Sequence, residues 1–164
     1  LFAKEWLSDP LIAGCLLPVT GVILLLASRW KEAVGDYRTM TPWQAIKIGL
    51  AQACAILPGL SRSGTTIAAG LMTGLSPRSA ATFSFLLALP AIAGAGVLEL
   101  IAMSREETSG TPVSYLLLAA TVSFVVGLAA IAGLVRLLER GKLHWFAWWC
   151  IPAGLAVIAM YWQR

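Results

Sequence analysis

Four long apolar segments, residues 11–28, 79–103, 113–135 and 145–162, dominate the chain. Each is close to the length of about 20 residues that one α-helix needs to cross a bilayer. The chain is 59% hydrophobic and only 12% charged, with a mean hydropathy of +0.80, so it is too apolar for an ordinary soluble domain of 164 residues. We therefore predict an all-α integral membrane protein with about four transmembrane helices.

The positions of the basic residues along the chain are typical of a membrane topology signal. They lie at the ends of the apolar segments and form no continuous stripe, so the net charge of +4 does not indicate a nucleic-acid partner. No cluster of Asp, Glu, His or Cys has the spacing of metal ligands. We therefore predict a membrane environment, no nucleic acid and no metal-binding residues in this chain.

A fifth apolar stretch, residues 43–75, is interrupted in its middle. Residues 43–57 and 67–75 are each too short for a full crossing. Two half-length helices around a turn of Gly, Pro and Ser predict a re-entrant pair that enters and leaves the membrane on one side. The alternative is one long broken helix that spans the membrane.

The boundaries of the re-entrant pair follow from its caps. Thr41 before Pro42 is typical of a helix start, and Ser76 before Pro77 marks the next one. The whole chain is then a single membrane domain. Its parts are a leading transmembrane helix in 1–30, the re-entrant pair in 41–78 and three transmembrane helices in 79–164.

The distribution of charge favours the re-entrant pair. With it, seven basic residues fall on one side of the membrane and three on the other, which indicates that the first side is cytoplasmic. A single crossing of residues 43–75 would give six against four. The seven are Arg29, Lys31, Arg38, Arg78, Arg136, Arg140 and Lys142, and the three are Lys4, Arg105 and Arg164.

The interruption itself, Pro58–Thr66, has the composition of an anion site. Arg62 lies between the charge-free apolar stretches 48–57 and 67–75, where a lone arginine costs about 3 kcal/mol or more unless it faces a cavity or a partner. Hydroxyl groups surround it, and the start of the second helix offers free amides. The planar guanidinium fork suits phosphate. The alternative is a kinked helix whose Arg62 pairs with Glu99 or reaches the interface.

At this point the sequence resembles the undecaprenyl-diphosphate phosphatase family, the bacitracin-resistance proteins of bacterial membranes. Pro58–Thr66 matches the family block P-G-x-S-R-S-G-x-[ST], and the flank from Arg78 to Leu87 with Pro90 and Gly94-Ala95 continues the match. The resemblance extends from about Thr41 to Trp162. It implies two inverted repeats, each with a re-entrant pair, so that this chain would hold half of an inverted-repeat fold.

The activity that the resemblance implies is hydrolysis of undecaprenyl diphosphate to undecaprenyl phosphate and phosphate. This reaction recycles the lipid carrier of peptidoglycan synthesis and confers bacitracin resistance, in the bacterial cytoplasmic (inner) membrane. The implied catalytic residues are Arg62 and Ser61. The implied phosphate-binding residues are Gly59, Ser61, Arg62, Ser63, Gly64, Thr65 and Thr66.

The family's acidic first block has no counterpart in this chain. That block is E-x-x-x-E followed by P-V-S-S-T-G-H, and it supplies the carboxylates for a divalent cation, Mg or Ca, and a histidine. Residues 17–21, Leu-Pro-Val-Thr-Gly, echo only its ending. We therefore expect an N-terminally truncated form, with undecaprenyl diphosphate as its lipid partner and either a second copy or a missing N-terminal half beside it. The alternative function is binding or transport of an isoprenyl phosphate without hydrolysis.

Overall fold

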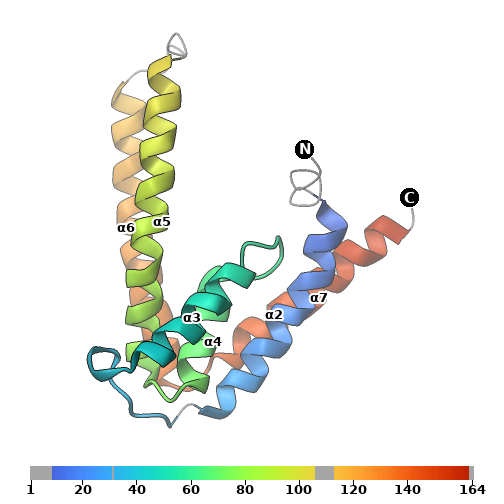
Figure 1. Cartoon of the computed structure of the whole chain (residues 1–164). Helices are drawn as coiled ribbons and strands as arrows, with labels where there is room; N and C mark the ends of the chain where they lie inside the picture. Colours follow the sequence, from blue (N-terminus) through green and yellow to red (C-terminus); the bar gives the residue numbers. More distant parts are fainter. Residues whose placement is uncertain (1–8, 31, 106–112, 163–164) are drawn as a thin grey trace.

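The computed structural model describes residues 9–30, 32–105 and 113–162, and the regular structure within these ranges is helical. Figure 1 shows the helices in chain order. Their bounds are α2 Pro10–Ala27, α3 Pro42–Cys54, α4 Arg62–Met72, α5 Pro77–Arg105, α6 Val113–Glu139 and α7 His144–Trp162, with short 3₁₀ turns η1 Ser28–Trp30 and η2 Tyr37–Thr39.

Four of the helices are long and apolar enough to cross a membrane: α2, α5, α6 and α7. The predicted fold class is therefore confirmed. With 13 and 11 residues, α3 and α4 are only roughly 20 Å and 16 Å long at 1.5 Å per residue, well short of a bilayer core. The prolines inside α2, α5 and α7 do not end those helices.

The first and last of these spanning helices, α2 and α7, pack along each other (Figure 1). Glycines allow the close approach. A Cβ atom added to Gly154 would lie 2.3 Å from Pro18 Cδ, and one added to Gly21 would lie 2.6 Å from Ile151 Cγ1. Inside a bilayer the hydrophobic effect does not drive helices together. Small residues at the contact let the backbones approach closely, and the resulting van der Waals packing stabilises the pair.

The two short helices form an antiparallel hairpin. Near the start of α3, Gln44 Nε2 donates to the carbonyl of Thr73 just after α4, at 2.8 Å. The loop before α3 also pairs with the loop after α4, because Gly35 N donates to Gly74 O at 3.0 Å and Ser76 N donates to Gly35 O at 2.8 Å. Both outer ends of the hairpin therefore lie at one end of the molecule (Figure 1).

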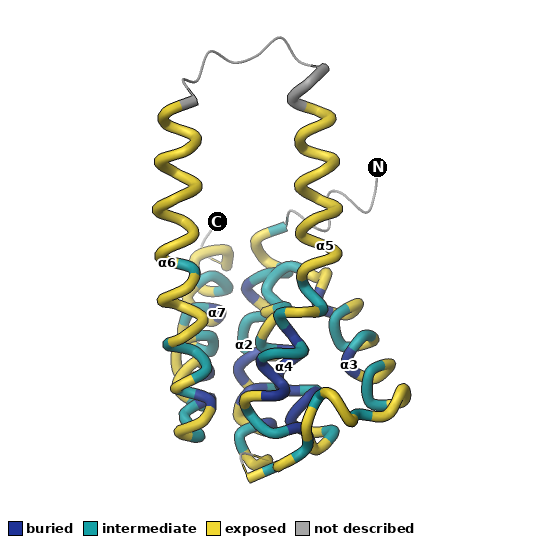
Figure 2. Tube along the Cα trace, turned by 90° about the vertical axis from the view of Figure 1, so that its left-hand side faces the viewer, coloured by how far each residue is buried: buried dark blue, intermediate teal, exposed yellow. Residues whose placement is uncertain are grey.

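Helix α4 lies at the centre of the core. Its buried residues include Ile67, Ala68 and Leu71, and it contacts α2, α3 and α5. The buried core continues through Leu24 of α2 and Ala80 of α5. Figure 2 shows that the buried residues gather around α4, whereas the outer halves of α5 and α6 are exposed and extend away from the rest.

The predicted helix caps are present, with one shift in boundary. Thr41 forms a capping box with Gln44, and Ser76 Oγ accepts from Ser79 N at 3.3 Å. Helix α4, however, begins at Arg62 and not after Thr66, because Ser61 caps it. The break is thus shorter than the polar run. Helix α6 also continues four residues beyond the apolar segment that ends at 135.

Candidate site at the N-terminus of α4

A turn between α3 and α4 brings the backbone directly against α2. Gly59 has φ +89°, a conformation that L side chains rarely adopt. A Cβ atom at this position would lie 2.3 Å from the carbonyl oxygen of Ala13. Two constraints therefore require glycine at this position: its positive φ and its close contact with Ala13. The turn is therefore held in direct contact with α2 at Ala13.

Thr20 of α2 fixes the same turn by hydrogen bonds. Its side chain is fully buried; Oγ1 donates to Gly59 O at 2.9 Å and accepts from Ser61 N at 3.2 Å. One hydroxyl thus satisfies a donor and an acceptor of a partly buried, irregular backbone, which would otherwise cost free energy. Thr20 sets the position from which α4 starts.

Ser61 caps α4 and leaves part of the first turn open. Its Oγ accepts from Gly64 N at 3.2 Å, and its carbonyl accepts from Thr65 N at 2.8 Å. Within the described part of the chain, the amides of Arg62 and Ser63 have no backbone acceptor. Free amides and the positive end of the helix dipole make such a start attractive to an anion.

Arg62 is half-buried and lines a cavity of about 400 Å³ between α3, α4 and α5. The other lining residues are Gly49, Gln52, Ala53, Ala55, Ile56 and Ala91. Glu99 is exposed, and no carboxylate among the residues that the structure describes forms an ion pair with Arg62. The guanidinium is thus available to a ligand.

Gln52 is a residue of this cavity that the sequence-based site did not include. Its Oε1 atom is buried and has no hydrogen-bond partner among the described residues. The unpaired amide oxygen and the unpaired guanidinium line the same cavity. A ligand, or a small rotation of the two side chains, can provide their missing hydrogen bonds. Its sequence signal was an amide, one of two in α3, in the middle of an otherwise mostly apolar helix, as Thr20 was the one hydroxyl of the charge-free α2.

Ser61, Ser63 and Gly64 face a second, smaller cavity of about 160 Å³. Its remaining walls are apolar apart from a thiol, and come from Leu24, Ile67, Leu134, Leu143, Phe146 and Cys150. The predicted phosphate-binding residues thus do not converge on one point. Arg62 lies on one side of the α4 start and the two serines lie on another.

Thr65 and Thr66 point into the helix packing. Thr66 Oγ1 donates to Arg62 O at 2.9 Å and shares a buried hydrogen bond with Ser84 of α5. Thr65 is buried and its Oγ1 has no partner among the described residues. These contacts are those of packing residues, and the role of the two threonines as phosphate ligands stays a prediction.

The described residues do not fit a divalent cation. In the part of the chain that the structure describes, no group of three or more His, Cys, Asp or Glu side chains is close enough to hold a metal ion. The cavity of Arg62 offers one amide oxygen and no carboxylate. Mg²⁺ and Ca²⁺ require several oxygen ligands, usually including carboxylates.

Four helices of spanning length, with a short helical hairpin whose second helix is buried and begins with an arginine, define a multi-pass helical membrane protein. The model of the family "Bacitracin resistance protein BacA" matches residues 1–156. The chain belongs to this family, and its four spans fit the multi-pass organisation of an inner-membrane protein.

Several curated relatives carry the name undecaprenyl-diphosphatase. The chain is 46% identical to the one from Rhodopirellula baltica, over 95% of this chain and 61% of the relative. It is 41% identical to that of Bacteroides thetaiotaomicron, over 92% and 57%, and 40% identical to that of Corynebacterium glutamicum, over 96% and 54%. The chain thus spans about three fifths of the length of the relatives it matches.

Proposed function

We propose that the protein to which this chain belongs hydrolyses undecaprenyl diphosphate to undecaprenyl phosphate and inorganic phosphate, and so recycles the lipid carrier of cell-wall synthesis. The family match and the names of the curated relatives support the reaction. The single observation that carries it here is Arg62, an unpaired guanidinium at a helix start with a cavity beside it.

The two cavities suit the two parts of such a substrate. A diphosphate at the start of α4 would accept hydrogen bonds from the amides of Arg62 and Ser63 and from the guanidinium fork. The cavity of Ser61 and Ser63 is otherwise largely apolar, which suits the first isoprene units. Thr20 and Gly59 would act as positioning residues, because they set where α4 begins.

In the hydrolysis, water attacks the terminal phosphorus and the bond to the bridging oxygen breaks. Inorganic phosphate leaves, and undecaprenyl phosphate takes the electron pair of the broken bond. Negative charge on the phosphoryl oxygens is what a fixed guanidinium and helix amides stabilise. Ser61, predicted as a second catalytic residue, would act by capping α4 and so holding the free amides of Arg62 and Ser63 toward the phosphate. A divalent cation, Mg or Ca, would add further charge stabilisation, from ligands that the described residues do not supply.

We also propose that α3 and α4 form a re-entrant pair within the bilayer. Both are too short to cross, and their outer ends lie together beside the basic loops. Irregular backbone at membrane depth must be buried in protein, and the turn at Gly59 is packed against α2. Half of an inverted-repeat fold would then be completed by a second copy or by the additional length that the relatives have.

A second candidate function is binding or transport of an isoprenyl phosphate without hydrolysis. The observation that favours it is the absence of any His or carboxylate among the described residues that line the cavity of Arg62. Hydrolysis needs a general base or a metal-bound water, whereas binding needs only the clamp. Broken helices at mid-membrane also hold anions in transporters.

Phosphate release from undecaprenyl diphosphate by the full-length protein in proteoliposomes tests the proposal. Arg62→Lys should lose about 10²-fold of turnover, because a point charge does not replace a bidentate donor. Arg140→Lys, an exposed position outside the site, is the matched control and should keep wild-type turnover. Near-normal turnover of Arg62→Lys would reject Arg62 as the phosphate ligand. Retained substrate without release by the wild type would favour the binding function.

A further inference from the structure

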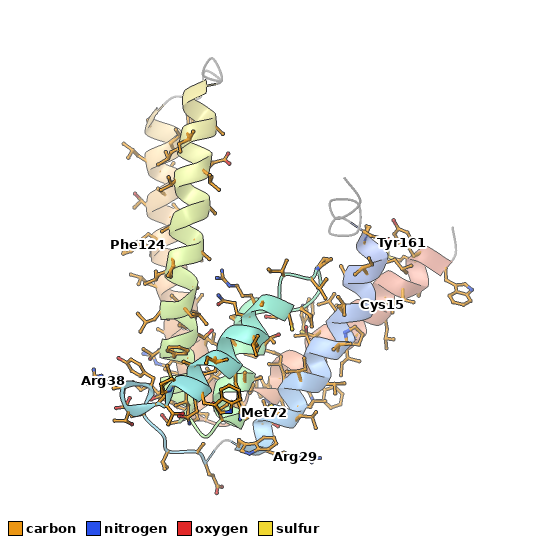
Figure 3. The ribbon with its side chains drawn as sticks, in the orientation of Figure 1. Cys15, Arg29, Arg38, Met72, Phe124 and Tyr161 are labelled. Atoms are coloured by element: carbon orange, nitrogen blue, oxygen red, sulfur yellow. The ribbon has the colours of Figure 1, made fainter. Side chains whose placement is uncertain are left out.

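A second polar cavity, of about 550 Å³, lies at the other end of α4, where the loops of the hairpin meet α5. Two arginines line it together with hydroxyls and one carboxylate: Val34, Asp36, Tyr37, Arg38, Ser76, Arg78, Ser79 and Thr82. It shares no residue with the cavities of Arg62 and Ser61, and the length of α4 separates it from them. Figure 3 shows Arg38 at this end of the molecule, beside the base of α5.

The cavity is built by a close backbone contact. Gly35 and Gly74 bring the loop before α3 against the loop after α4, with hydrogen bonds on both sides of Gly35. A Cβ atom on Gly35 would lie 2.5 Å from Gly74 O, and Gly74 itself has φ +95°. The contact holds Arg38, from one loop, near Arg78, from the first turn of α5.

The charged groups favour an anion. Arg38 Nε donates to the Tyr37 hydroxyl at 3.3 Å, and this hydrogen bond raises the pKa of the guanidinium further above its ordinary value. The opposing carboxylate, Asp36, accepts from Arg38 N at 3.1 Å and caps η2. Two arginines from different segments therefore line the cavity with one carboxylate that already accepts a hydrogen bond.

Ser79 supports a ligand in this cavity independently of the two arginines. Its side chain is only 8% exposed and lines the cavity, yet its hydroxyl has no hydrogen-bond partner among the described residues. By contrast, Ser76 and Thr82 are engaged, since Ser76 Oγ accepts from Ser79 N and Thr82 Oγ1 donates to Arg78 O. The Ser79 hydroxyl shares the cavity lining with two arginines and is free to donate to a bound acceptor.

We propose that this cavity binds a phosphate group at the membrane surface, either in the headgroup of an anionic phospholipid or as free inorganic phosphate. Phosphate oxygens match paired guanidinium donors, and basic residues beside a membrane attract anionic headgroups. The site lies at the start of a spanning helix, where headgroups are found. It is independent of the proposed hydrolysis, because it uses none of the residues around Arg62.

Two measurements on the whole chain in nanodiscs distinguish a phospholipid headgroup from free inorganic phosphate. The first is the enrichment of phosphatidylglycerol around the protein, by mass spectrometry of lipids retained from a mixture of four parts phosphatidylcholine and one part phosphatidylglycerol. The second is calorimetric titration of inorganic phosphate in phosphatidylcholine alone. Arg38→Gln with Arg78→Gln should lower one of these affinities about tenfold or more, since charge-assisted hydrogen bonds contribute roughly 1.5–3 kcal/mol each.

The matched control removes the same charge from the same end of the molecule. Arg136→Gln with Arg140→Gln should leave both measurements close to wild type. Ser79→Ala keeps both charges and should still weaken binding several-fold, which guards against a misfolded double variant. Loss only in the first measurement assigns a lipid headgroup, and loss only in the second assigns free phosphate. No loss in either, or equal loss in the control, overturns the proposal.

Discussion

The hydroxyl of Thr20 donates a hydrogen bond of 2.9 Å to the carbonyl of Gly59, so a side chain of α2 fixes the turn from which α4 begins. The same oxygen accepts from Ser61 N. The arginine that follows is therefore placed by a contact between residues far apart in the chain, and not by the polar run alone.

Thr20→Val keeps the shape of the side chain and removes both hydrogen bonds. Leaving two partly buried backbone groups without partners should cost about 1–3 kcal/mol of stability. Thr121→Val is the control, because Thr121 Oγ1 bonds only within its own exposed helix. Thermal unfolding in detergent should show a lower midpoint for Thr20→Val alone. Equal midpoints for the two variants would contradict the role of Thr20.

Three glycine-to-alanine variants separate backbone strain from crowding. Gly94→Ala lies in α5 with open space around it and should be neutral or slightly stabilising. Gly74→Ala meets no atom but has positive φ, and should lose about 1–2 kcal/mol. Gly59→Ala adds a clash with Ala13 O and should lose the most. Any other order of unfolding midpoints would mean that the turn at Gly59 relaxes freely.

Thr66 and Ser84 should be energetically coupled, because their hydroxyls share a buried hydrogen bond between α4 and α5. A double-mutant cycle with Thr66→Val and Ser84→Ala should give a coupling of about 0.5–3 kcal/mol. The cycle of Ser84→Ala with Thr121→Val, which lies on α6, should be additive. If both cycles were additive, the hydrogen bond would contribute nothing to the packing of α4.

Gln52→Leu should affect stability and activity in opposite ways. Removing the buried, unpaired Oε1 removes a desolvation cost, so the unfolding midpoint should stay or rise. If the proposed hydrolysis takes place beside Arg62, phosphate release by the full-length protein should fall by about tenfold, or about 1.4 kcal/mol, because the cavity loses a polar group that could bind the ligand. A fall in stability without a change in turnover would assign Gln52 to the fold and not to the site.

Local signals gave the helices and most of their starts. Four apolar segments predicted the four spans, and Thr41-Pro42 and Ser76-Pro77 predicted two caps that the structure contains. The start of α4 was predicted too late, because the hydroxyls and glycine of 61–66 were read as a turn. Ser61 caps the helix instead, and its first turn tolerates Ser, Gly and Thr.

The long-range parts of the site could not be predicted in this way. Thr20 and Gly59 are 39 residues apart, and the contact of Gly35 with Gly74 also joins distant loops. Nothing in a run of residues specifies which helix will pack against a turn. The separation of Arg62 from Ser61 and Ser63 into two cavities follows from the rotation of α4 in the core, which depends on its packing against α2 and α5.

The pairing of α2 with α7 has a consequence for biogenesis. The contacts of Gly154 with Pro18, and of Gly21 with Ile151, join the earliest and latest spans described here. Because α2 is synthesised before α7, it has no contact with this partner until α7 has been made and inserted. Since α2 carries the threonine that anchors the turn, Arg62 reaches its final surroundings only after α7 has joined α2.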